Sequence, residues 1–443
     1  MRLLILAAAV AFALPAAAQT PPEPTPATRA MAAGYKALMV CGAVKNAEAA
    51  GGSRTVGSVE ANELVGIYPE LDPLVREMTA EVGPNSVSVA WDEAMPPRTA
   101  VWHPGRGCSI MPVGWSDGVA ETARQAVQPE PGFEIGVPRD PAALEAALVR
   151  AREGGYGEGA NTTGVVVLQA DRLVGEWYAP GFGPDTPQRT WSVAKSLAGT
   201  IIGAAVQRGE VDVNAPAAIA DWSREGDPRG AITLDQLMRM ASGLTSDTAG
   251  NRTDALYFGG VGVDEQATTW PLIAPPGARY RYANNDTLLA VQSIAETFGA
   301  HPPAELFRTL GMHDTWAETD WRGNYVLSSQ VWSTARDLAR FGQLYVDDGV
   351  VDGVRVLPVG WRDYVSRPSG PQPRGAQGYG ATFWLMNNSE GVPPDTISAN
   401  GNRGQYVIIV PSRRVVIVRR GEDPAGRRFD FIAFTRDVLA ALD

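Results

Sequence analysis

Lysine is very scarce in this sequence of 443 residues. It occurs only at Lys36, Lys45 and Lys195, and the remaining basic side chains are arginine apart from the histidines. Arginine keeps its proton in proteins, whereas a buried lysine gives it up readily. Lys195 is therefore the only side-chain amine in the C-terminal three quarters of the chain that is suited to act as a base.

Histidine and several motifs are also scarce or missing, which excludes whole classes of enzyme. The only histidines are His103, His301 and His313. There is no zinc-protease helix motif, no P-loop, no G-x-S-x-G turn and no G-x-G-x-x-G after a strand. We expect His301 and His313 to be structural or surface residues, so a Ser-His-Asp triad is disfavoured. We also predict that the protein uses no metal and no organic cofactor.

Long apolar runs are confined to the N-terminus. Residues 1–18 combine Arg2, an apolar run too short to span a membrane, and small residues before Gln19, as in a cleaved signal peptide. No cysteine follows this site, so a lipid anchor is not indicated, and no later run is long enough to predict a transmembrane helix. We therefore expect an exported protein, periplasmic or secreted, with cleavage after Ala18.

Cys41 and Cys108 are the only two cysteines. In an oxidising compartment an even pair most simply forms a disulfide. The alternative, in which one of them is a nucleophile, is disfavoured.

The overall composition indicates a folded acidic protein. Hydrophobic residues make up 44% and charged residues 20%, which suffices for a packed core. The net charge of -11 argues against nucleic acid or an anionic membrane surface as the main partner. Oligomeric state is not indicated.

The length and the Pro-rich segments divide the chain into two units. We expect a Pro-rich, flexible lead-in at residues 19–28, an N-terminal unit at 29–126, a linker at 127–138 and a larger unit at 139–443. Within the N-terminal unit, residues 62–78 are expected to be helical. No motif defines the role of this unit; covering an active site and restricting substrate entry are the two candidate roles.

The larger unit begins and ends with helix and strand signals. Asp140 and Pro141 start a helix that stops at Gly154, and a hairpin follows at residues 163–169 and 173–178. Strands are predicted at 404–410 and 415–419 and a helix at 428–442, with a mostly helical middle. This order predicts an α+β fold, in which an antiparallel sheet is flanked by its N- and C-terminal helices and accompanied by a helical subdomain.

Ser192 precedes Lys195 by three residues at the start of an apolar helical segment. Residues at i and i+3 share a helix face, so the amine is expected beside the hydroxyl. The free N–H groups of a helix N-terminus favour a developing negative charge. An adjacent base activates a weak hydroxyl nucleophile. A chance S-x-x-K at a helix start is the competing interpretation.

Five segments extend this pattern in a fixed order. They are TWSVAKSLAGTIIGAAVQRGEVDVNAP, ITLDQLMRMASGL, PPGARYRYANNDTLLA, LGMHDT and ANGNRGQYVIIVP. Residues 138–443 thereby resemble the β-lactamase-related serine hydrolases of the penicillin-recognising fold. Within that family they are most similar to the class C and 6-aminohexanoate-oligomer-hydrolase or esterase branch.

The resemblance assigns roles to individual residues. It implies that Ser192 is acylated, that Lys195 accepts its proton and that Tyr282 is a phenolic acid or base. Asn284 would contact the substrate or the lysine, and it also fits as the cap of the following helix. Tyr280 is a neighbour that is easily mistaken for Tyr282. Independently, a phenol beside a lysine shares its proton and passes it to a leaving group.

The third element departs from the penicillin-handling pattern. Where relatives that bind β-lactam carboxylates show K-T-G, this chain has Ala399, Asn400 and Gly401. The resemblance implies that Gly401 allows close approach of a substrate, and that the N–H of Asn402 joins that of Ser192 in an oxyanion hole. Arg403 is a candidate to replace the lost charge, although an arginine in a turn more often faces solvent.

Several further residues have structural roles or fit two roles equally well. Ser242 is expected at a structural helix end, after a helix capped by Thr233 and Gln236. The aromatic residues near the motifs fit either a substrate cleft or ordinary packing: Trp191, Tyr257, Phe258, Tyr379 and Trp384.

The leading functional hypothesis is hydrolysis of an amide or ester of a small or peptide-like substrate. The alternatives are a D-alanyl-D-alanine carboxypeptidase or β-lactamase, and a catalytically silent binding protein on the same fold.

Overall fold

The structure is a computed structural model that describes residues 23–115, 132–245 and 253–443. The predicted signal peptide and parts of the predicted lead-in and linker lie outside these ranges. Among the described residues, no helix combines the length and apolar character needed to cross a membrane.

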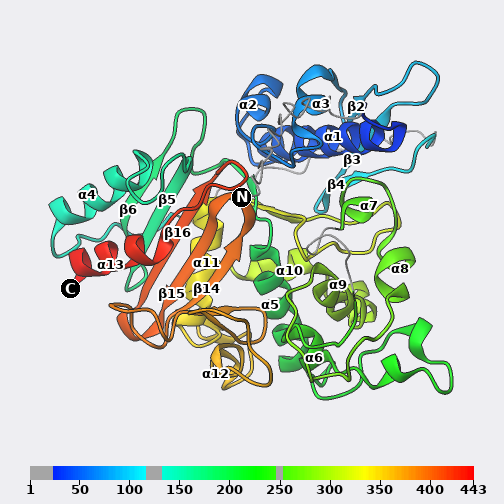
Figure 1. The fold of residues 1–443 in the computed structure, drawn as a ribbon. Coiled ribbons are helices and arrows are strands. Elements are labelled where there is room, and N and C mark those ends of the chain that lie inside the picture. Colours follow the sequence, from blue (N-terminus) through cyan, green and yellow to red (C-terminus); the bar gives the residue numbers. More distant parts are fainter. Residues whose placement is uncertain (1–22, 116–131, 246–252) are drawn as a thin grey trace, which may run out of the picture.

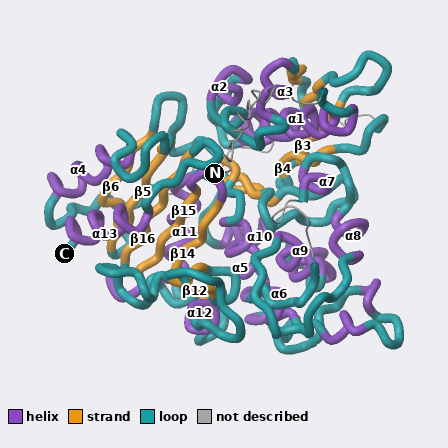
Figure 2. The backbone as a smooth tube through the Cα atoms, in the orientation of Figure 1, coloured by secondary structure: helices purple, strands orange, loops and turns teal. Residues whose placement is uncertain are grey.

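A seven-stranded antiparallel sheet forms the centre of the larger unit, in the order β12-β13-β14-β15-β16-β5-β6 (Figures 1 and 2). Its strands are β5 (Thr162–Gln169), β6 (Arg172–Tyr178), β12 (Gly378–Tyr379), β13 (Trp384–Leu385), β14 (Ile397–Gly401), β15 (Gln405–Val410) and β16 (Val415–Gly421). The first and last parts of this unit therefore meet at β5 and β16, which are adjacent strands.

Both faces of the sheet are covered by helices, as its sequence requires. Alternate residues of a strand point to opposite faces. Val165 and Val167 accordingly pack with α4 (Pro141–Arg152) and α13 (Phe431–Leu442), whereas Val166 and Leu168 belong to the core on the other face. There α11 (Ala335–Val346) crosses the central strands (Figure 1).

The helical subdomain lies beside the sheet (Figure 1). Its α-helices are α5 (Val193–Gln207), α6 (Leu234–Met238), α7 (Asp254–Tyr257), α8 (Val263–Gln266), α9 (Asn284–Gln292) and α10 (Pro303–Thr309). A further helix, α12 (Trp361–Ser366), lies at the β12 edge of the sheet (Figure 2). Single-turn 3-10 helices occur at Ala220–Trp222, Pro228–Ala231, Ala267–Thr269, Ala295–Gly299, Asn402–Gly404 and Pro411–Arg413. Two small sheets are β7 (Gln188–Arg189), β9 (Val331–Ser333) and β8 (Thr315–Ala317), and β10 (Val350–Val351) with β11 (Val354–Arg355).

The N-terminal unit consists of one long helix against a small antiparallel sheet. Its elements are α1 (Pro26–Ala49), α2 (Val56–Ala61), α3 (Asp72–Glu77), β1 (Ala80–Val82), β2 (Ser86–Val89), β3 (Arg98–His103) and β4 (Gly107–Ile110). Every residue of α1 from Ala32 to Ala47 is buried, because the sheet covers one side of the helix and the larger unit covers the other. The N-terminal unit is thus packed into the body of the protein.

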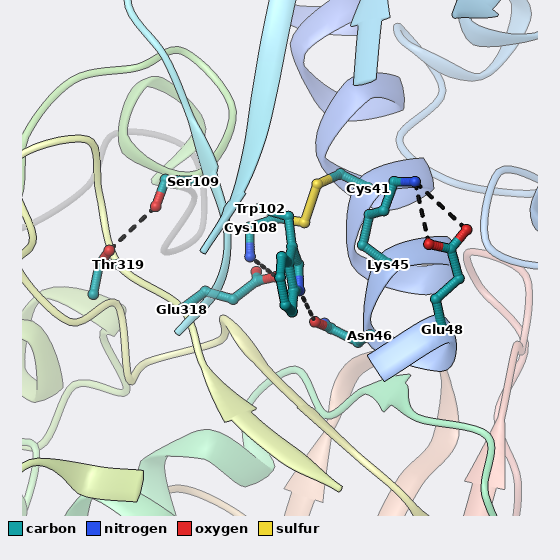
Figure 3. The surroundings of a disulfide bond; sticks show 9 residues. All are labelled: Cys41, Lys45, Asn46, Glu48, Trp102, Cys108, Ser109, Glu318 and Thr319. Carbon is teal, nitrogen blue, oxygen red and sulfur yellow. Dashed lines mark hydrogen bonds and ion pairs between the residues drawn. A yellow bond between two sulfur atoms is a disulfide. The ribbon is translucent and has the colours of Figure 1, made fainter. Parts of the chain in front are cut away.

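A disulfide joins Cys41 of α1 to Cys108 of β4, with an S–S distance of 2.02 Å (Figure 3). The backbone N–H of Cys108 also donates to Glu318 of the larger unit at 3.0 Å, and Ser109 Oγ lies 3.1 Å from Thr319 Oγ1. The disulfide therefore ties α1 to β4 within the N-terminal unit, and the two hydrogen bonds join that unit to the larger one.

Two local expectations about the N-terminal unit are wrong. Residues 62–78 do not form one helix: only Asp72–Glu77 is helical, because Gly66 takes a left-handed φ of 62° and Pro69 interrupts the segment. The lead-in is not flexible up to residue 28, since α1 begins at Pro26 with Thr25 as its cap.

The expectations for the larger unit agree with the structure. Asp140 caps α4 by accepting from the N–H of Ala143 at 3.0 Å. The hairpin is β5–β6, the late strands are β15 and β16, and the final helix is α13. The predicted α+β fold with a flanked antiparallel sheet and a helical subdomain is confirmed.

Candidate active site

Ser192 and Lys195 lie together at the start of α5. Lys195 Nζ is 3.1 Å from Ser192 Oγ. Ser192 occupies the N-cap position of α5 but its side chain makes no capping bond, so the hydroxyl does not contact the helix backbone. Trp191, immediately before it, holds a left-handed φ of 50°, which is strained for an aromatic residue. Strain of this kind is typical of functional sites.

Two oxygen atoms complete the surroundings of the lysine. Lys195 Nζ donates to Asn284 Oδ1 and to the backbone carbonyl of Ser328, both at 2.7 Å. The side chain is almost fully buried, and burial lowers the pKa of Lys195 to about 7. A substantial fraction of this amine is therefore neutral near pH 7, as a general base requires.

Asn284 is not the cap of the following helix, contrary to one of its two predicted roles. It is the first residue of α9, and Ala283 occupies the N-cap position. Its amide Nδ2 lies 3.4 Å from Thr253 Oγ1, which turns Oδ1 toward Lys195. Because Asn284 Oδ1 accepts the hydrogen bond of Lys195, it does not accept one from a backbone N–H of its own helix.

Tyr282 lies over the same lysine. Lys195 Nζ is 5.1 Å from the centroid of the Tyr282 ring. The ring packs against Trp384 at 5.3 Å and Tyr379 at 5.9 Å between centroids. Burial raises the pKa of the Tyr282 phenol above its usual value, an effect that a hydrogen bond with Ser192 partly offsets. Tyr282 is thus a neutral phenol in contact with Ser192.

Tyr280 is placed differently from Tyr282. Its hydroxyl is buried and has no hydrogen-bond partner among the described residues. Its ring lies 5.6 Å from Tyr379. Tyr280 therefore belongs to the aromatic packing behind the site.

Gly401 brings the end of β14 against the segment that carries Ser192. A Cβ atom at this position would lie 2.4 Å from the carbonyl oxygen of Thr190. Only glycine permits this approach. Asn402 follows on the surface, and its Oδ1 accepts from the N–H of Arg403 at 2.9 Å.

Arg403 is not exposed to solvent, although an arginine in a turn usually is. It does not replace the missing cation either. Its guanidinium is buried, pairs with Glu422 at 2.7 Å and donates to the carbonyl of Asn62 at 2.8 Å. Because its left-handed φ of 58° sends the side chain under the N-terminal unit, its charge is neutralised there.

Ser328 was not found by sequence reasoning. It contributes a backbone carbonyl, which any residue type supplies, and it lies 133 positions from Lys195. Its hydroxyl also lies 2.7 Å from the hydroxyl of Tyr257, whose sequence context fits both a cleft and ordinary packing. No sequence signal identified this partner.

The expected structural residues are in place. Thr233 and Gln236 form the capping box of α6, as predicted. Ser242 Oγ donates to Asp286 Oδ1 of α9 at 2.9 Å and so ties two helix ends together.

Other features of the described residues lie away from this site. A cavity of about 440 Å³ separates the C-terminal part of α1 from α10, and Trp102, Phe307 and Trp316 are among its lining residues. It includes neither Ser192 nor Lys195. Within the described ranges, no group of three or more His, Cys, Asp or Glu side chains is arranged to hold a metal ion.

Comparison with known proteins identifies the family of the chain. The model of the Beta-lactamase family matches residues 144–432, more than half of the chain. The chain therefore belongs to the Beta-lactamase family and is a serine hydrolase.

Individual relatives are distant. The 6-aminohexanoate-dimer hydrolase of Paenarthrobacter ureafaciens is 24% identical over 330 residues, which cover 64% of this chain and 79% of that protein. A Bacillus anthracis structure assigned as a 6-aminohexanoate-dimer hydrolase matches with a TM-score of 0.56 and 22% identity, over 70% of this chain and 86% of that one. The octameric penicillin-binding protein homologue of Pyrococcus abyssi matches with a TM-score of 0.52 and 18% identity, over 67% and 76%. The two structures share the fold of this chain.

Proposed function

We propose that this protein hydrolyses an amide or ester bond of a small or peptide-like substrate through an acyl-enzyme on Ser192. The observation that carries the proposal is the set of three oxygen atoms around the buried amine of Lys195. A neutral amine has two N–H bonds and one lone pair. With the N–H bonds directed to Asn284 Oδ1 and the Ser328 carbonyl, the lone pair remains for the proton of Ser192.

Tyr282 serves in this mechanism as the acid. Its raised pKa keeps the phenol protonated, so it has a proton to donate to a leaving nitrogen or oxygen. Ser192 Oγ attacks the carbonyl carbon as its proton passes to Lys195. The C–N or C–O bond then breaks as Tyr282 protonates the leaving group, and Tyr282 regains a proton from Lys195. Water attacks the ester by the same route and restores Ser192.

The developing negative charge on the substrate oxygen requires fixed donors. We assign this role to the backbone N–H groups of Ser192 and Asn402. Ser192 stands at the N-terminal end of α5, where the helix dipole favours negative charge. The contact between Gly401 and the carbonyl of Thr190 supports the placement of Asn402 beside it.

The substrate class follows from two considerations. The relative from Paenarthrobacter ureafaciens is named for hydrolysis of a 6-aminohexanoate dimer, which supports a linear amide as substrate. A β-lactam or a D-alanyl-D-alanine peptide presents a carboxylate, but position 399 is alanine and Arg403 is paired with Glu422. Amidase or esterase activity is therefore favoured over carboxypeptidase or β-lactamase activity.

We further propose that the protein acts outside the cytoplasm. The Cys41–Cys108 disulfide supports an oxidising compartment, since such bonds are rare in the cytosol. Mass spectrometry of the mature protein from its host tests this, with an N-terminus at Gln19 expected and an intact residue 1 contradicting it.

Hydrolysis of short p-nitrophenyl esters, linear amides including the 6-aminohexanoate dimer, and a β-lactam would test the proposal. Ser192→Ala should abolish turnover. Ser196→Ala is the matched control, because the hydroxyl of this neighbouring serine donates to the carbonyl of Thr382 and not to Lys195 or Ser192. It should retain activity.

The pattern of substrates decides among the alternatives. Turnover of esters or amides supports the proposal, whereas rapid hydrolysis or stable acylation by the β-lactam alone favours the penicillin-handling alternatives. Absence of turnover by the wild type on all of these leaves a narrow peptide-like substrate or a binding role, and full activity of Ser192→Ala contradicts the mechanism.

A further inference from the structure

Arg189, three residues before Ser192, is a buried arginine that makes no direct ion pair with a carboxylate of the described residues. Its side chain is 1% exposed. The buried Glu318 interacts with its charge without a direct ion pair, and burial of a guanidinium that lacks such a pair is costly. The contacts of this side chain therefore need an explanation.

Those contacts converge on the segment 328–329. Arg189 Nη2 donates to Ser329 Oγ at 2.9 Å, and Nε donates to the carbonyl of Ser329 at 3.4 Å. Ser329 directly follows Ser328, whose carbonyl accepts from Lys195. The guanidinium thus restrains the hydroxyl and the carbonyl of Ser329. Ser329 is the neighbour of Ser328, whose carbonyl orients Lys195.

Tyr257 restrains the same segment from the other side. Its hydroxyl lies 2.7 Å from Ser328 Oγ, and its backbone carbonyl accepts from Gln330 Nε2 at 3.2 Å. The guanidinium of Arg189 is 5.6 Å from the Tyr257 ring. Residues 328–330 are therefore fixed at three successive side chains.

Arg189 also contacts the segment before the nucleophile. Its guanidinium carbon lies 3.9 Å from the ring centroid of Trp191, the residue with the left-handed φ. On the far side, Nη1 lies 3.7 Å from the sulfur of Met39 on α1. Because α1 closes the space behind Arg189, the guanidinium has little freedom to move.

We propose that Arg189 and Tyr257 are positioning residues for catalysis: together they hold the Ser328 carbonyl where it directs the lone pair of Lys195 at Ser192. This inference rests on the proposed function. It concerns two side chains that form hydrogen bonds with the segment 328–329 and not with Ser192 or Lys195. Their loss is expected to lower the rate at which Ser192 reacts, while the fraction of protein that is able to react stays the same.

The rate and the extent of reaction of Ser192 are separable with a fluorophosphonate probe. Ser192 Oγ forms a bond to phosphorus, fluoride leaves, and Lys195 takes the serine proton. Intact-protein mass spectrometry reports how much protein is labelled in the end and how fast. A merely structural role lowers the labelled fraction, whereas a positioning role lowers the rate at full labelling.

Tyr257→Phe and Ser329→Ala each remove one hydroxyl and leave the fold intact. We expect each to label completely but about 10-fold more slowly than the wild type, and the double variant about 100-fold more slowly, since small misplacements of reacting groups have effects of this size. Hydrolysis of a p-nitrophenyl ester should lose kcat by the same factors with little change in KM. Arg189→Lys, which keeps the charge but not the fork, should behave like Ser329→Ala.

Arg336→Met is the matched control. Arg336 forms a bidentate pair with Glu176, remote from Ser192, and its loss should leave rate and extent unchanged. Wild-type rates in Tyr257→Phe and Ser329→Ala, or a reduced labelled fraction at unchanged rate, would overturn the positioning role. Labelling of Ser192→Ala at the wild-type rate would instead overturn the proposed function and the inference with it.

Discussion

Asn284 Oδ1 lies 2.7 Å from Lys195 Nζ, although the two residues are 89 positions apart. The amide accepts from the lysine without adding charge, so the amine keeps its lowered pKa. Asn284→Asp places a carboxylate there, which favours the ammonium form and raises the pKa of Lys195 by about 1 unit or more. The acid limb of kcat/KM should move to higher pH by that amount, with kcat/KM at pH 7 reduced about 5-fold or more.

The pH profiles of the wild type and the variant check this expectation. Asn214→Asp, a change of the same chemistry in an exposed loop, is the control and should reproduce the wild-type profile. An unshifted acid limb in Asn284→Asp would show that this contact does not govern the lysine.

The wild-type pH dependence follows from the pKa of Lys195. Its usual value near 10.5 falls to about 7 because the charged form is desolvated. The base is the neutral amine, so kcat/KM should rise with pH and reach half its plateau near pH 7. Stability has the same sign: between pH 7 and 10.5 the unfolded chain binds more protons than the folded one, so this group makes the free energy of unfolding increase with pH. A kcat/KM that stays flat down to pH 5 would argue against Lys195 as the base.

Tyr282 and Tyr280 form a natural pair for comparison. Tyr282→Phe removes the acid and should lower kcat by about 100-fold or more. Tyr280→Phe removes a buried hydroxyl without a hydrogen-bond partner among the described residues, and its kcat and melting temperature should equal or exceed those of the wild type. Steady-state kinetics measures kcat, and thermal unfolding measures the melting temperature, of both variants. Equal losses in the two variants would contradict the assignment of Tyr282.

The parts of the site that the sequence predicted are those encoded by local spacing. The Ser192–Lys195 contact needs only one helical turn, and the hairpin and capping signals of Asp140 and Thr233 are local as well. The order of landmarks added Tyr282 and Gly401 by resemblance. Local chemistry of this kind is readable before the fold is known.

The remaining features depend on tertiary contacts. A backbone carbonyl such as that of Ser328 is supplied by any residue type, so the sequence does not indicate it. The burial of Arg403 could not be predicted, because its partner Glu422 and the overlying N-terminal unit come from distant segments. The helix expected at 62–78 failed because Gly66 packs against Pro424, a contact from the far end of the chain. In each case a distant segment determined the outcome.

The Cys41–Cys108 disulfide should contribute strongly to stability. It closes a loop with a sequence separation of 67, which stabilises a fold by about 4 kcal/mol in the chain-entropy view. The double variant Cys41→Ala/Cys108→Ala should therefore melt well below the wild type. A reductant should lower the melting temperature of the wild type toward that of the variant and leave the variant unchanged. Equal melting temperatures without reductant would contradict this contribution.

Gly401→Ala tests the approach of β14 to the nucleophile segment. The added methyl would lie 2.4 Å from the carbonyl oxygen of Thr190 and 2.9 Å from Cβ of Gln405, so strand or segment has to move. Overpacking of this kind costs about 1–3 kcal/mol of stability, which the fold tolerates. A displacement next to Ser192 should nevertheless lower kcat/KM by about 100-fold. Gly57→Ala on α2 meets nothing within 4 Å and serves as the control. Wild-type kcat/KM in Gly401→Ala would mean that the end of β14 takes no part in the oxyanion site.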